Sequence, residues 1–384
     1  MTEAADPALA RLVDQVQTAR AARGALDIRG GGTKAFYGEA PRGEPLDVTP
    51  LRGISSYEPS ELVVTARAGT PLAELEAALA EKGQCLPFEP PRFGHSGTHQ
   101  QTVPPAGSTV GGTVGGTVGG MVAAGLAGPA RACVGGVRDY VLGATLLNGR
   151  AEVLSFGGQV MKNVAGYDVA RVLAGSMGAL GVICEVSLKV LPQPVATATL
   201  RFELDQAAAL VQLNRWGGQP LPLSASAWWD GMLVLRLAGA RAAVDSACAA
   251  LGGEAIEPGL AASFWSGLRD HTDEFFAGAL KAVQGGATLW RLSVPQTAPV
   301  LALSGEQLIE WGGAQRWLCT STPASQLREA AATAGGHATL FRGADKAGGA
   351  FAPLSAPLER IQRQLKAAFD PDGVFNPGRL YPWL

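Results

Sequence analysis

The chain has 384 residues, of which 47% are hydrophobic and 17% are charged, and its net charge at pH 7 is −2. This length exceeds a single comfortable core and predicts two domains, while the near-neutral charge excludes electrostatic binding of nucleic acid or of an anionic membrane surface. The N-terminal segment contains acidic residues and no apolar region of a signal peptide, so we expect a cytoplasmic protein.

The spacing of cysteines and histidines argues against a metal centre. The five cysteines lie far apart and form no CxxC pair, which disfavours a zinc site or an iron–sulfur cluster. His95 and His99 are four residues apart, but their segment is rich in Gly, Ser and Thr and holds no carboxylate. His271 and His337 are isolated in the sequence. We therefore predict no metal site.

The first quarter of the chain alternates helical and strand patterns. Apolar residues at helical spacing predict an amphipathic helix over residues 7–23, and ALDIRGGGTKAF follows as a short strand that ends in three glycines. A further strand is predicted over residues 62–68. The next helix is expected to have Thr70 as its N-cap, to run to Lys82 and to stop at Gly83.

A glycine-rich run, TVGGTVGGTVGGMVAAGLAGP, occupies residues 109–129. Glycine pairs allow positive φ and let main-chain N–H groups converge on an anion, so the run predicts a phosphate-holding loop followed by a short helix, MVAAGLAG. We expect the copy of TVGG that precedes Met121 to bind, and the first two copies to be an inserted flexible extension. The spacing of Gly111, Gly115 and Gly119 also fits a packed membrane helix, but the many glycines and the scarcity of large apolar residues disfavour it.

Strand patterns follow this run. VLGATLLNGRAEVLSF predicts a β-hairpin with a two-residue turn at Asn148 and Gly149. Apolar and polar residues alternate from Cys184 to Val190, which predicts a strand with one buried face. The Pro-Gln-Pro sequence within residues 191–194 predicts a domain boundary.

The second half of the chain has the order of a ferredoxin-like α+β layer, an antiparallel sheet with helices on one side. The predicted elements are a strand over 197–204, a helix over 206–216, a hairpin turning at 230–231, a helix over 242–251, and strands in TLWRLSVP and AQRWLCTS. Aromatic pairs at 228–229, 264–265 and 275–276 are expected in the core of this domain, with a subunit interface as the alternative. A helix from about Pro357 and the tail DPDGVFNPGRLY are expected to pack back on another part of the protein.

Two glycine-rich loops, RGGGTK at 29–34 and TVGGMVAAG at 117–125, each lie next to a predicted strand. Two such loops suggest a diphosphate clasped from two sides. A Rossmann fold would instead place GxGxxG in one strand–turn–helix with an acidic residue about twenty positions later, and RGGGTK does not fit that pattern.

Several segments together resemble the FAD-binding fold of the vanillyl-alcohol oxidase and p-cresol methylhydroxylase (PCMH) family. They are IRGGGTKAF, VVTARAGTPLAELEAALAEKGQCLPFEPP, TVGGMVAAGLAGP, the segment from VRDYVLGATLLNG to GVICEVSLKVLP, and GVFNPGRLY. VMKNVAGYD, GEQLIEWGGAQRWL and FAPLSAPL resemble one branch of that family, the FAD-binding E subunits of bacterial glycolate oxidases. The resemblance covers nearly the whole chain, and the loop over 95–108 and the extra TVGG copies look like an insertion relative to it.

The resemblance implies an α+β fold in three parts: a two-subdomain PCMH-type FAD-binding domain over residues 1–192, a ferredoxin-like α+β cap domain over residues 193–355, and a C-terminal segment, residues 356–384, that returns to the FAD domain. It also implies a non-covalent FAD, because the first loop has neither the histidine nor the cysteine to which covalently flavinylated relatives attach the cofactor.

Carried over position by position, the resemblance implies that two loops hold the FAD pyrophosphate and that a third segment lines the adenine through main-chain groups. The first loop supplies Gly30, Gly31, Gly32, Thr33 and Lys34, the second supplies Thr117, Val118, Gly119, Gly120, Ala124 and Gly125, and the adenine segment is Gly181, Val182 and Ile183.

No catalytic residue can be assigned. Catalytic relatives carry a GHxGDGNxH pattern, and the nearest segment here is GGHATLFRG with His337 alone, which we expect to be a surface or core histidine. Four residues have side chains that can bind a substrate carboxylate: Arg342, Lys162, Tyr167 and Arg379. We expect each of them instead to be a solvated charge or to make a structural hydrogen bond.

The resemblance and the missing pattern favour an FAD-binding subunit of a heteromeric glycolate oxidase, which oxidises glycolate and related 2-hydroxy acids such as D-lactate, glycolate giving glyoxylate. Its partners would be a catalytic FAD subunit and an iron–sulfur subunit, and the complex would lie in the cytoplasm or at the inner face of the cytoplasmic membrane. Two alternatives stay open: a self-sufficient FAD-linked 2-hydroxyacid dehydrogenase, and a non-catalytic flavin-fold scaffold.

Overall fold

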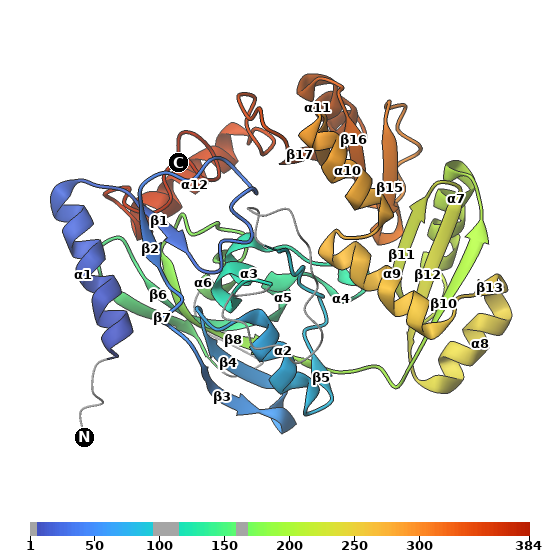
Figure 1. Cartoon of the computed structure of the whole chain (residues 1–384), viewed down its shortest axis with the longest axis horizontal. Coiled ribbons are helices and arrows are strands. Elements are labelled where there is room, and N and C mark those ends of the chain that lie inside the picture. The colour runs from blue at the N-terminus through green and yellow to red at the C-terminus, as the bar shows by residue number, and fades with distance from the viewer. Residues whose placement is uncertain (1–5, 95–114, 159–167) are drawn as a thin grey trace.

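The computed structural model of the chain describes residues 6–94, 115–158 and 168–384. Figure 1 shows two α+β halves side by side, the first coloured blue to green and the second yellow to orange, with the red C-terminal helix back over the first half. The α+β class and the returning C-terminal segment are as expected. The first two TVGG copies lie almost wholly outside the described residues.

The first half is built on a five-stranded antiparallel sheet in the order β3-β4-β8-β6-β7. Its strands are β3 (Ile54–Glu58), β4 (Val63–Arg67), β6 (Val141–Leu147), β7 (Val153–Gly157) and β8 (Val182–Lys189). Two small sheets join it: the parallel pair β1 (Leu26–Arg29) and β2 (Glu44–Asp47), and the antiparallel pair β5 (Gln84–Cys85) and β9 (Leu191–Pro192).

Helices cover both faces of this sheet. One face packs against α2 and α3, and the other against α1 and the β1–β2 pair. The helices are α1 (Pro7–Ala22), α2 (Leu72–Ala80), α3 (Val118–Ala124), α4 (Arg131–Val134), α5 (Val137–Tyr140) and α6 (Val169–Val172), with a 3-10 turn η1 (Pro59–Glu61) before β4. The central strand β8 is therefore buried on both sides, and Ser187, expected on a solvent face, is buried and bonds to Thr65 at 2.9 Å.

Two local predictions in this half are wrong. Thr70 does not cap α2: the N-cap position is Pro71, and the Thr70 hydroxyl instead bonds to the main chain of Gly53 at 2.9 and 3.0 Å. The β6–β7 hairpin does not turn in two residues, because the loop runs from Asn148 to Glu152 and is closed by the Asn148 side chain, which accepts from the N–H groups of Arg150 and Glu152. In both cases a polar side chain finds a better main-chain partner than local spacing suggests.

The second half is an eight-stranded sheet in the order β13-β10-β12-β11-β15-β16-β14-β17. Its strands are β10 (Ala196–Glu203), β11 (Leu223–Trp229), β12 (Met232–Gly239), β13 (Glu254–Ala255), β14 (Thr288–Ser293), β15 (Glu306–Glu310), β16 (Gln315–Thr320) and β17 (His337–Arg342). The hairpin at 230–231 is the expected two-residue turn, with positive φ at both Asp230 and Gly231. Only two residue pairs, between β11 and β15, join the two four-stranded parts of the sheet.

Helices lie on both faces of this sheet, not on one. The helices α7 (Gln206–Gly217), α8 (Arg241–Leu251) and α11 (Ala324–Thr333) cover the outer face, and α9 (Pro258–Asp270) and α10 (Glu274–Gln284) cover the other. In Figure 1, α9 lies between the sheet and the first half of the molecule. The aromatic pairs are largely core, since Trp265, Phe275 and Phe276 are buried.

The C-terminal segment packs on the first half and forms hydrogen bonds with β1 and with Ala179. After α12 (Ala356–Phe369), the tail pairs with β1 through bonds from Leu26 N to Val374 O at 2.7 Å and from Asn376 N to Leu26 O at 2.9 Å. The buried Lys366 donates to Asp370 and to the main chain of Ala179 and Phe375. The tail therefore supports the strand from which the first glycine-rich loop begins.

Candidate functional site

The two glycine-rich loops that are far apart in the sequence are in contact. A Cβ atom on Gly30 would clash with the Thr117 hydroxyl, and one on Gly116 would lie 2.9 Å from Thr33 Oγ1 and 3.2 Å from Lys34 Nζ. Gly116 also has a φ of +87°, which favours glycine. Only residues without side chains allow the loops to approach this closely.

The first loop presents main-chain donors. Among the described residues, no acceptor takes the N–H groups of Gly31, Gly32 or Thr33. Consecutive N–H groups of this kind form an anion-binding concavity. Arg379 holds the loop from behind by donating to the carbonyls of Lys34, Ala35 and Glu39, which is the structural hydrogen-bonding role expected of it.

The second loop comes close to the first, but its main-chain N–H groups at Val118 and Gly119 are already bonded. Thr117 caps α3 by accepting from Gly120 N at 3.2 Å. The N–H of Val118 bonds to Thr70 O at 2.9 Å, and that of Gly119 bonds to Ala68 O at 2.8 Å. A Cβ on Gly119 would lie 2.6 Å from the Cβ of Ala68. Val118 and Gly119 therefore bring the loop close to the site but have no N–H left for a phosphate.

The remaining residues predicted to bind the cofactor lie at the end of α3 and at the start of β8. Gly125 ends α3 with a φ of +63°, and a Cβ on it would lie 2.9 Å from Gly175, while Ala124 is buried beside it. Gly181 has a φ of +148° and precedes β8, in which Val182 and Ile183 are buried and pair with β6. Ile183 shares a hydrophobic core with Val118 of the second loop, and the role of this segment toward adenine stays a prediction.

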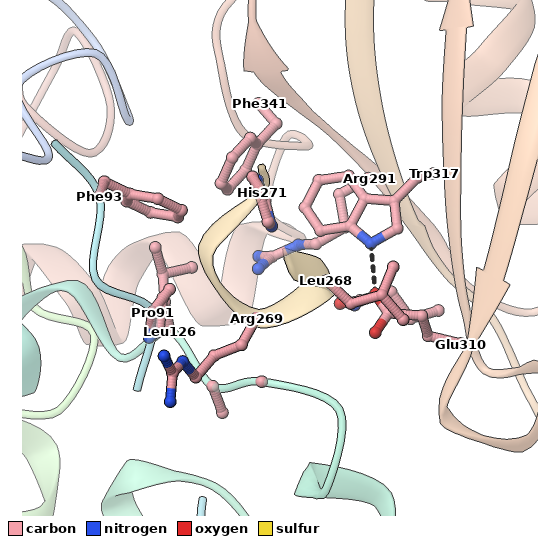
Figure 2. A pocket seen from close by; sticks show the side chains of 13 residues that line it. Pro91, Phe93, Leu126, Leu268, Arg269, His271, Arg291, Glu310, Trp317 and Phe341 are labelled. Carbon is pink, nitrogen blue, oxygen red and sulfur yellow. Dashed lines mark hydrogen bonds between the residues drawn. The ribbon is translucent and has the colours of Figure 1, made fainter. Parts of the chain in front are cut away.

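A chamber lies where the loops of the first half meet the sheet of the second (Figure 2). Its cavity volume is about 10 Å³, which is enough for about one water molecule. We call it the chamber from here on. Its walls come from both halves and include Phe93, Leu126, His271, Arg291, Glu310, Trp317 and Phe341.

Aromatic rings surround His271 in the chamber. The imidazole stacks on Phe276 with ring centroids 3.7 Å apart and meets Trp317, Phe93 and Phe341 at 4.9, 5.0 and 5.3 Å. Burial, and then the positive charges of Arg342 and Arg291, lower its pKa well below the usual value, so the ring is neutral. Its Nδ1 is buried without a hydrogen-bond partner among the described residues.

Arg291 lines the chamber, and Arg342 and Lys34 lie next to its Phe93 wall. Arg291 donates to the Tyr37 hydroxyl at 3.0 Å, and the guanidinium of Arg342 lies 3.4 Å from the centroid of the Phe36 ring. In both arginines the buried Nε finds no partner among the described residues. Desolvation lowers the pKa of Arg342 to about 10 and that of Lys34, whose amine lies 5.7 Å from the Phe93 centroid, to about 8, with Asp270 opposing the shift at Lys34.

The nearby carboxylates are already engaged. Asp270 is paired in a fork with Arg269 at 2.8 and 2.6 Å and also accepts from Arg92 N. Glu310 accepts from Trp317 Nε1 at 2.7 Å and from Gln315 Nε2 at 3.0 Å, and burial raises its pKa to about 7. The chamber thus holds more positive than negative charge.

The spacing of residues in the sequence did not predict the chamber. His271, Arg291 and Glu310 were not singled out as a group, and Arg342 was weighed only as one of several cations. The available signal was an arginine next to a tryptophan and two leucines in a predicted strand, Arg291 in TLWRLS. His337 is exposed at the start of β17, as expected, whereas His95, His99, Lys162 and Tyr167 lie outside the described residues. In the described ranges, no group of three His, Cys, Asp or Glu residues could hold a metal ion, and no helix is long and apolar enough to cross a membrane.

Comparison with known proteins agrees with this geometry. A family model described as an FAD binding domain matches residues 9–99. The chain is 47% identical over 373 residues to the glycolate oxidase subunit GlcE of Escherichia coli (strain K12), covering 97% of each chain. It is 27% identical over 174 residues to the glycolate oxidase subunit GlcD of Bacillus subtilis (strain 168), covering 45% of this chain and 33% of that one.

A structural likeness extends beyond these sequence matches. A solved structure of alkyldihydroxyacetonephosphate synthase superposes with a TM-score of 0.61 at 14% identity, covering 95% of this chain and 74% of that one. At this identity the likeness shows a shared fold, and it supports the expected α+β, PCMH-type architecture.

Proposed function

The chain belongs to the family of glycolate oxidase subunits that includes GlcE of Escherichia coli, and from this premise we propose that it is the FAD-binding subunit of a heteromeric glycolate oxidase whose two glycine-rich loops hold the cofactor diphosphate. It is an FAD-dependent oxidoreductase subunit. The observation that carries the assignment of the site is the contact between the loops, with the N–H groups of Gly31 to Thr33 free to meet an anion.

The residues fit the cofactor as follows. Gly30, Gly31, Gly32, Thr33 and Lys34 would hold the diphosphate, with Lys34 as its cation, and Thr117, Gly119 and Gly120 would bring the second loop close to it. Ala124, Gly125, Gly181, Val182 and Ile183 would extend the site toward the adenine. Bound FAD supplies an acceptor for the two electrons released when a 2-hydroxy acid is oxidised. We assign residues 1–192 to the FAD-binding domain, 193–355 to the cap and 356–384 to the returning segment.

In this proposal the oxidation of glycolate to glyoxylate takes place in a complex with a catalytic FAD subunit and an iron–sulfur subunit, located in the cytoplasm or at the inner membrane face. The similar protein GlcE is a glycolate oxidase subunit, which supports the need for partners. Glu310, which lines the chamber, and the nearby Asp270 are both engaged with donors in the same chain, which also supports a relay or assembly role for this subunit.

One observation favours a second candidate, a self-sufficient 2-hydroxyacid dehydrogenase. Glu310 lines the chamber with Arg291, and burial raises the pKa of this carboxyl to about 7. A general base works best with a pKa near the working pH, and an arginine can hold a substrate carboxylate. Glu310 would first have to release one of its two donors.

An anaerobic reduction experiment separates the two candidates. The full chain is purified with FAD, and glycolate or D-lactate is added while absorbance near 450 nm is followed. We expect the flavin to stay oxidised alone and to be reduced when the catalytic partner subunit and glycolate are added. Rapid bleaching of the isolated chain would establish the self-sufficient enzyme, and a chain that retains no FAD would overturn both proposals.

A further inference from the structure

We propose that the open edge of β10 is a docking site for an extended segment of a partner subunit, which adds to the sheet as a strand and places an acidic side chain in a cleft beside the edge. The inference rests on the proposed function in one respect, the need for a partner chain. It uses residues of the second half that lie apart from the two glycine-rich loops.

Strand β10 has a neighbour along only part of its outer edge. β13 pairs with two residues of β10, Leu200 and Arg201. After Ile256 the chain leaves the sheet and begins α9 at Pro258. In the described part of the chain, no strand lies on this side of residues 196–198. The first half of β10 is therefore an uncovered strand edge.

The main-chain groups of Thr197 point to this open edge. Thr197 lies opposite Ala238 of β12, whose N–H donates to Pro222 O at 2.9 Å on the side away from β10. In an antiparallel pair, opposed residues point their N–H and C=O groups either toward each other or away from each other, so those of Thr197 point outward. Thr199 agrees, because its carbonyl accepts from Ile256 N on the outer side. Thr197 thus offers the two groups that an added strand uses.

A cleft lies beside this edge, between β10 and α9, which are neighbours in Figure 1. Its volume is about 280 Å³, many times the roughly 10–15 Å³ that one water molecule needs, so it has room for a side chain. We call it the edge cleft. Arg269 lines both this cleft and the chamber. The walls of the edge cleft include Thr197, Thr199, Arg236, Ala262, Trp265 and Glu89.

The unspent polar groups in the edge cleft are mostly donors. The buried Thr199 hydroxyl accepts from Trp265 Nε1 at 3.0 Å, and its own hydrogen has no acceptor among the described residues. Arg236 and Arg269 each use Nε and Nη2 on partners in the chain and keep Nη1 without a described acceptor. The Glu89 carboxylate is already taken by Arg236 and a main-chain N–H. A side chain with oxygen acceptors fits these donors, and a carboxylate makes the stronger, charge-assisted bonds with a guanidinium.

Two exposed apolar side chains border the edge cleft. Val195, which is 78% exposed, comes two residues before Thr197, and Leu260, which is 66% exposed, lies on α9 between Pro258 and Ala262. Side chains two positions apart in a strand share a face, so the partner residue opposite Thr197 faces the cleft and the one opposite Val195 packs on that valine. The docking segment should therefore carry Asp or Glu two residues from an apolar residue.

Binding of the separately purified partner subunits to the FAD-loaded full chain tests the inference by biolayer interferometry. We expect one of the two subunits to bind, and Thr197→Pro, Val195→Asp and Ala262→Phe each to weaken that binding about tenfold or more. Thr197→Pro removes the outward N–H, and Ala262→Phe fills the cleft. The matched control is Val211→Asp, which changes a valine of similar exposure, 69%, on α7.

Thermal unfolding provides the control for the fold. Proline is tolerated in an edge strand where the N–H faces outward, so Thr197→Pro should melt with the parent chain. A large fall in its melting temperature would show that this N–H is bonded inside the sheet and would overturn the inference. A benzophenone side chain introduced at Val195 then maps the partner segment by cross-linking and mass spectrometry. A cross-linked segment without Asp or Glu would contradict the proposed occupant.

The outcomes separate this inference from the proposed function. If the parent chain binds neither partner subunit, both fail. If a complex forms equally well with the parent and with all three edge variants, only the docking site is wrong. Self-association of the parent that Thr197→Pro abolishes, with partner binding unchanged, would assign the edge to a second copy of this chain and would also overturn the inference.

Discussion

The glycine-rich loops and the chamber beside them are built in opposite ways. The loops meet through the main chain at positions where a side chain would not fit, and their donors are backbone N–H groups. The chamber is made of large aromatic and charged side chains from both halves of the molecule, packed around His271. The loop site therefore requires residues without a Cβ atom, and the chamber requires particular side chains to be buried together.

This difference governs how each site responds to mutation. Adding one carbon to a loop glycine forces the main chain to move, whereas changing one chamber side chain alters charge or hydrogen bonding and leaves the backbone in place.

The support under the loops is the most sensitive point. Lys366 is 9% exposed and donates to Asp370 at 2.7 Å, to Ala179 O at 2.8 Å and to Phe375 O at 2.7 Å. Lys366→Met leaves the buried Asp370 carboxylate without its cation, so we expect the free energy of unfolding to fall by about 3–5 kcal/mol. Urea unfolding of the purified chain measures this.

The control for this variant is Arg360→Met, an exposed position on the same helix, which should change the free energy of unfolding by less than about 0.5 kcal/mol. A loss below about 1 kcal/mol in Lys366→Met would mean that the N–H groups of Val374 and Phe375, which also bond to Asp370, satisfy the carboxylate by themselves.

A single methyl group should separate the two glycine-rich loops. The Cβ of Gly30→Ala would clash with Thr117 Oγ1, so the loops must move apart. We expect FAD affinity to fall about 10- to 100-fold, corresponding to about 1.4–2.8 kcal/mol, measured by fluorescence titration of the FAD-free chain.

Gly278→Ala is the matched change, because the new Cβ would lie in open space on the exposed side of α10. It should leave FAD affinity unchanged and stabilise the chain by about 0.5–1 kcal/mol. Equal FAD affinity in Gly30→Ala and the parent chain would contradict the assignment of the diphosphate to these loops.

In the chamber, Glu310 should make stability depend on pH. Burial raises its pKa to about 7 from a usual 4.5, so the folded state holds a proton that the unfolded state has lost over that range. Its contribution to stability is fully present below pH 4.5 and is lost as the pH rises through 7. Glu310→Gln keeps an acceptor for Trp317, so we expect it to be more stable than the parent by about 1–2 kcal/mol at pH 8 and equal to it at pH 4.5.

The difference between variant and parent is the quantity to follow by thermal unfolding at several pH values, because the titration of Asp273, whose pKa burial raises to about 6, and of His271 then cancels to first order. A variant whose stability tracks the parent at every pH would show that Glu310 is ionised in the folded chain.

The same contrast explains what the sequence could and could not predict. RGGGTK and TVGGM were recognisable because a main-chain site requires glycine at fixed positions, and the returning tail was recognisable from its prolines and aromatics. The helices on the second face of this sheet were missed because α9 and α10 were not among the predicted elements: their aromatic pairs were assigned to the core, and burial in the core does not by itself say helix or strand. The chamber was missed because Phe93, His271, Arg291 and Phe341 meet only after the two halves pack together.

The smallest predicted effect concerns the junction of the two halves. Trp311 donates from Nε1 to Gly128 O at 3.1 Å, and the Arg131 guanidinium lies 4.6 Å from its ring centroid. Gly128 lines the chamber from the first half, so this hydrogen bond holds a chamber wall against the sheet of the second half. Trp311→Phe keeps the ring and removes the donor, and we expect a loss of about 1 kcal/mol in thermal unfolding.

Trp228→Phe is the matched change within one half, because Trp228 Nε1 donates to Leu204 O at 2.8 Å and both residues belong to the second half. The two variants should lose similar stability, because each removes one hydrogen-bond donor and keeps a ring in its place. A negligible loss in Trp311→Phe beside a loss of about 1 kcal/mol in Trp228→Phe would show that this chamber wall is held by aromatic packing and not by the hydrogen bond to Gly128.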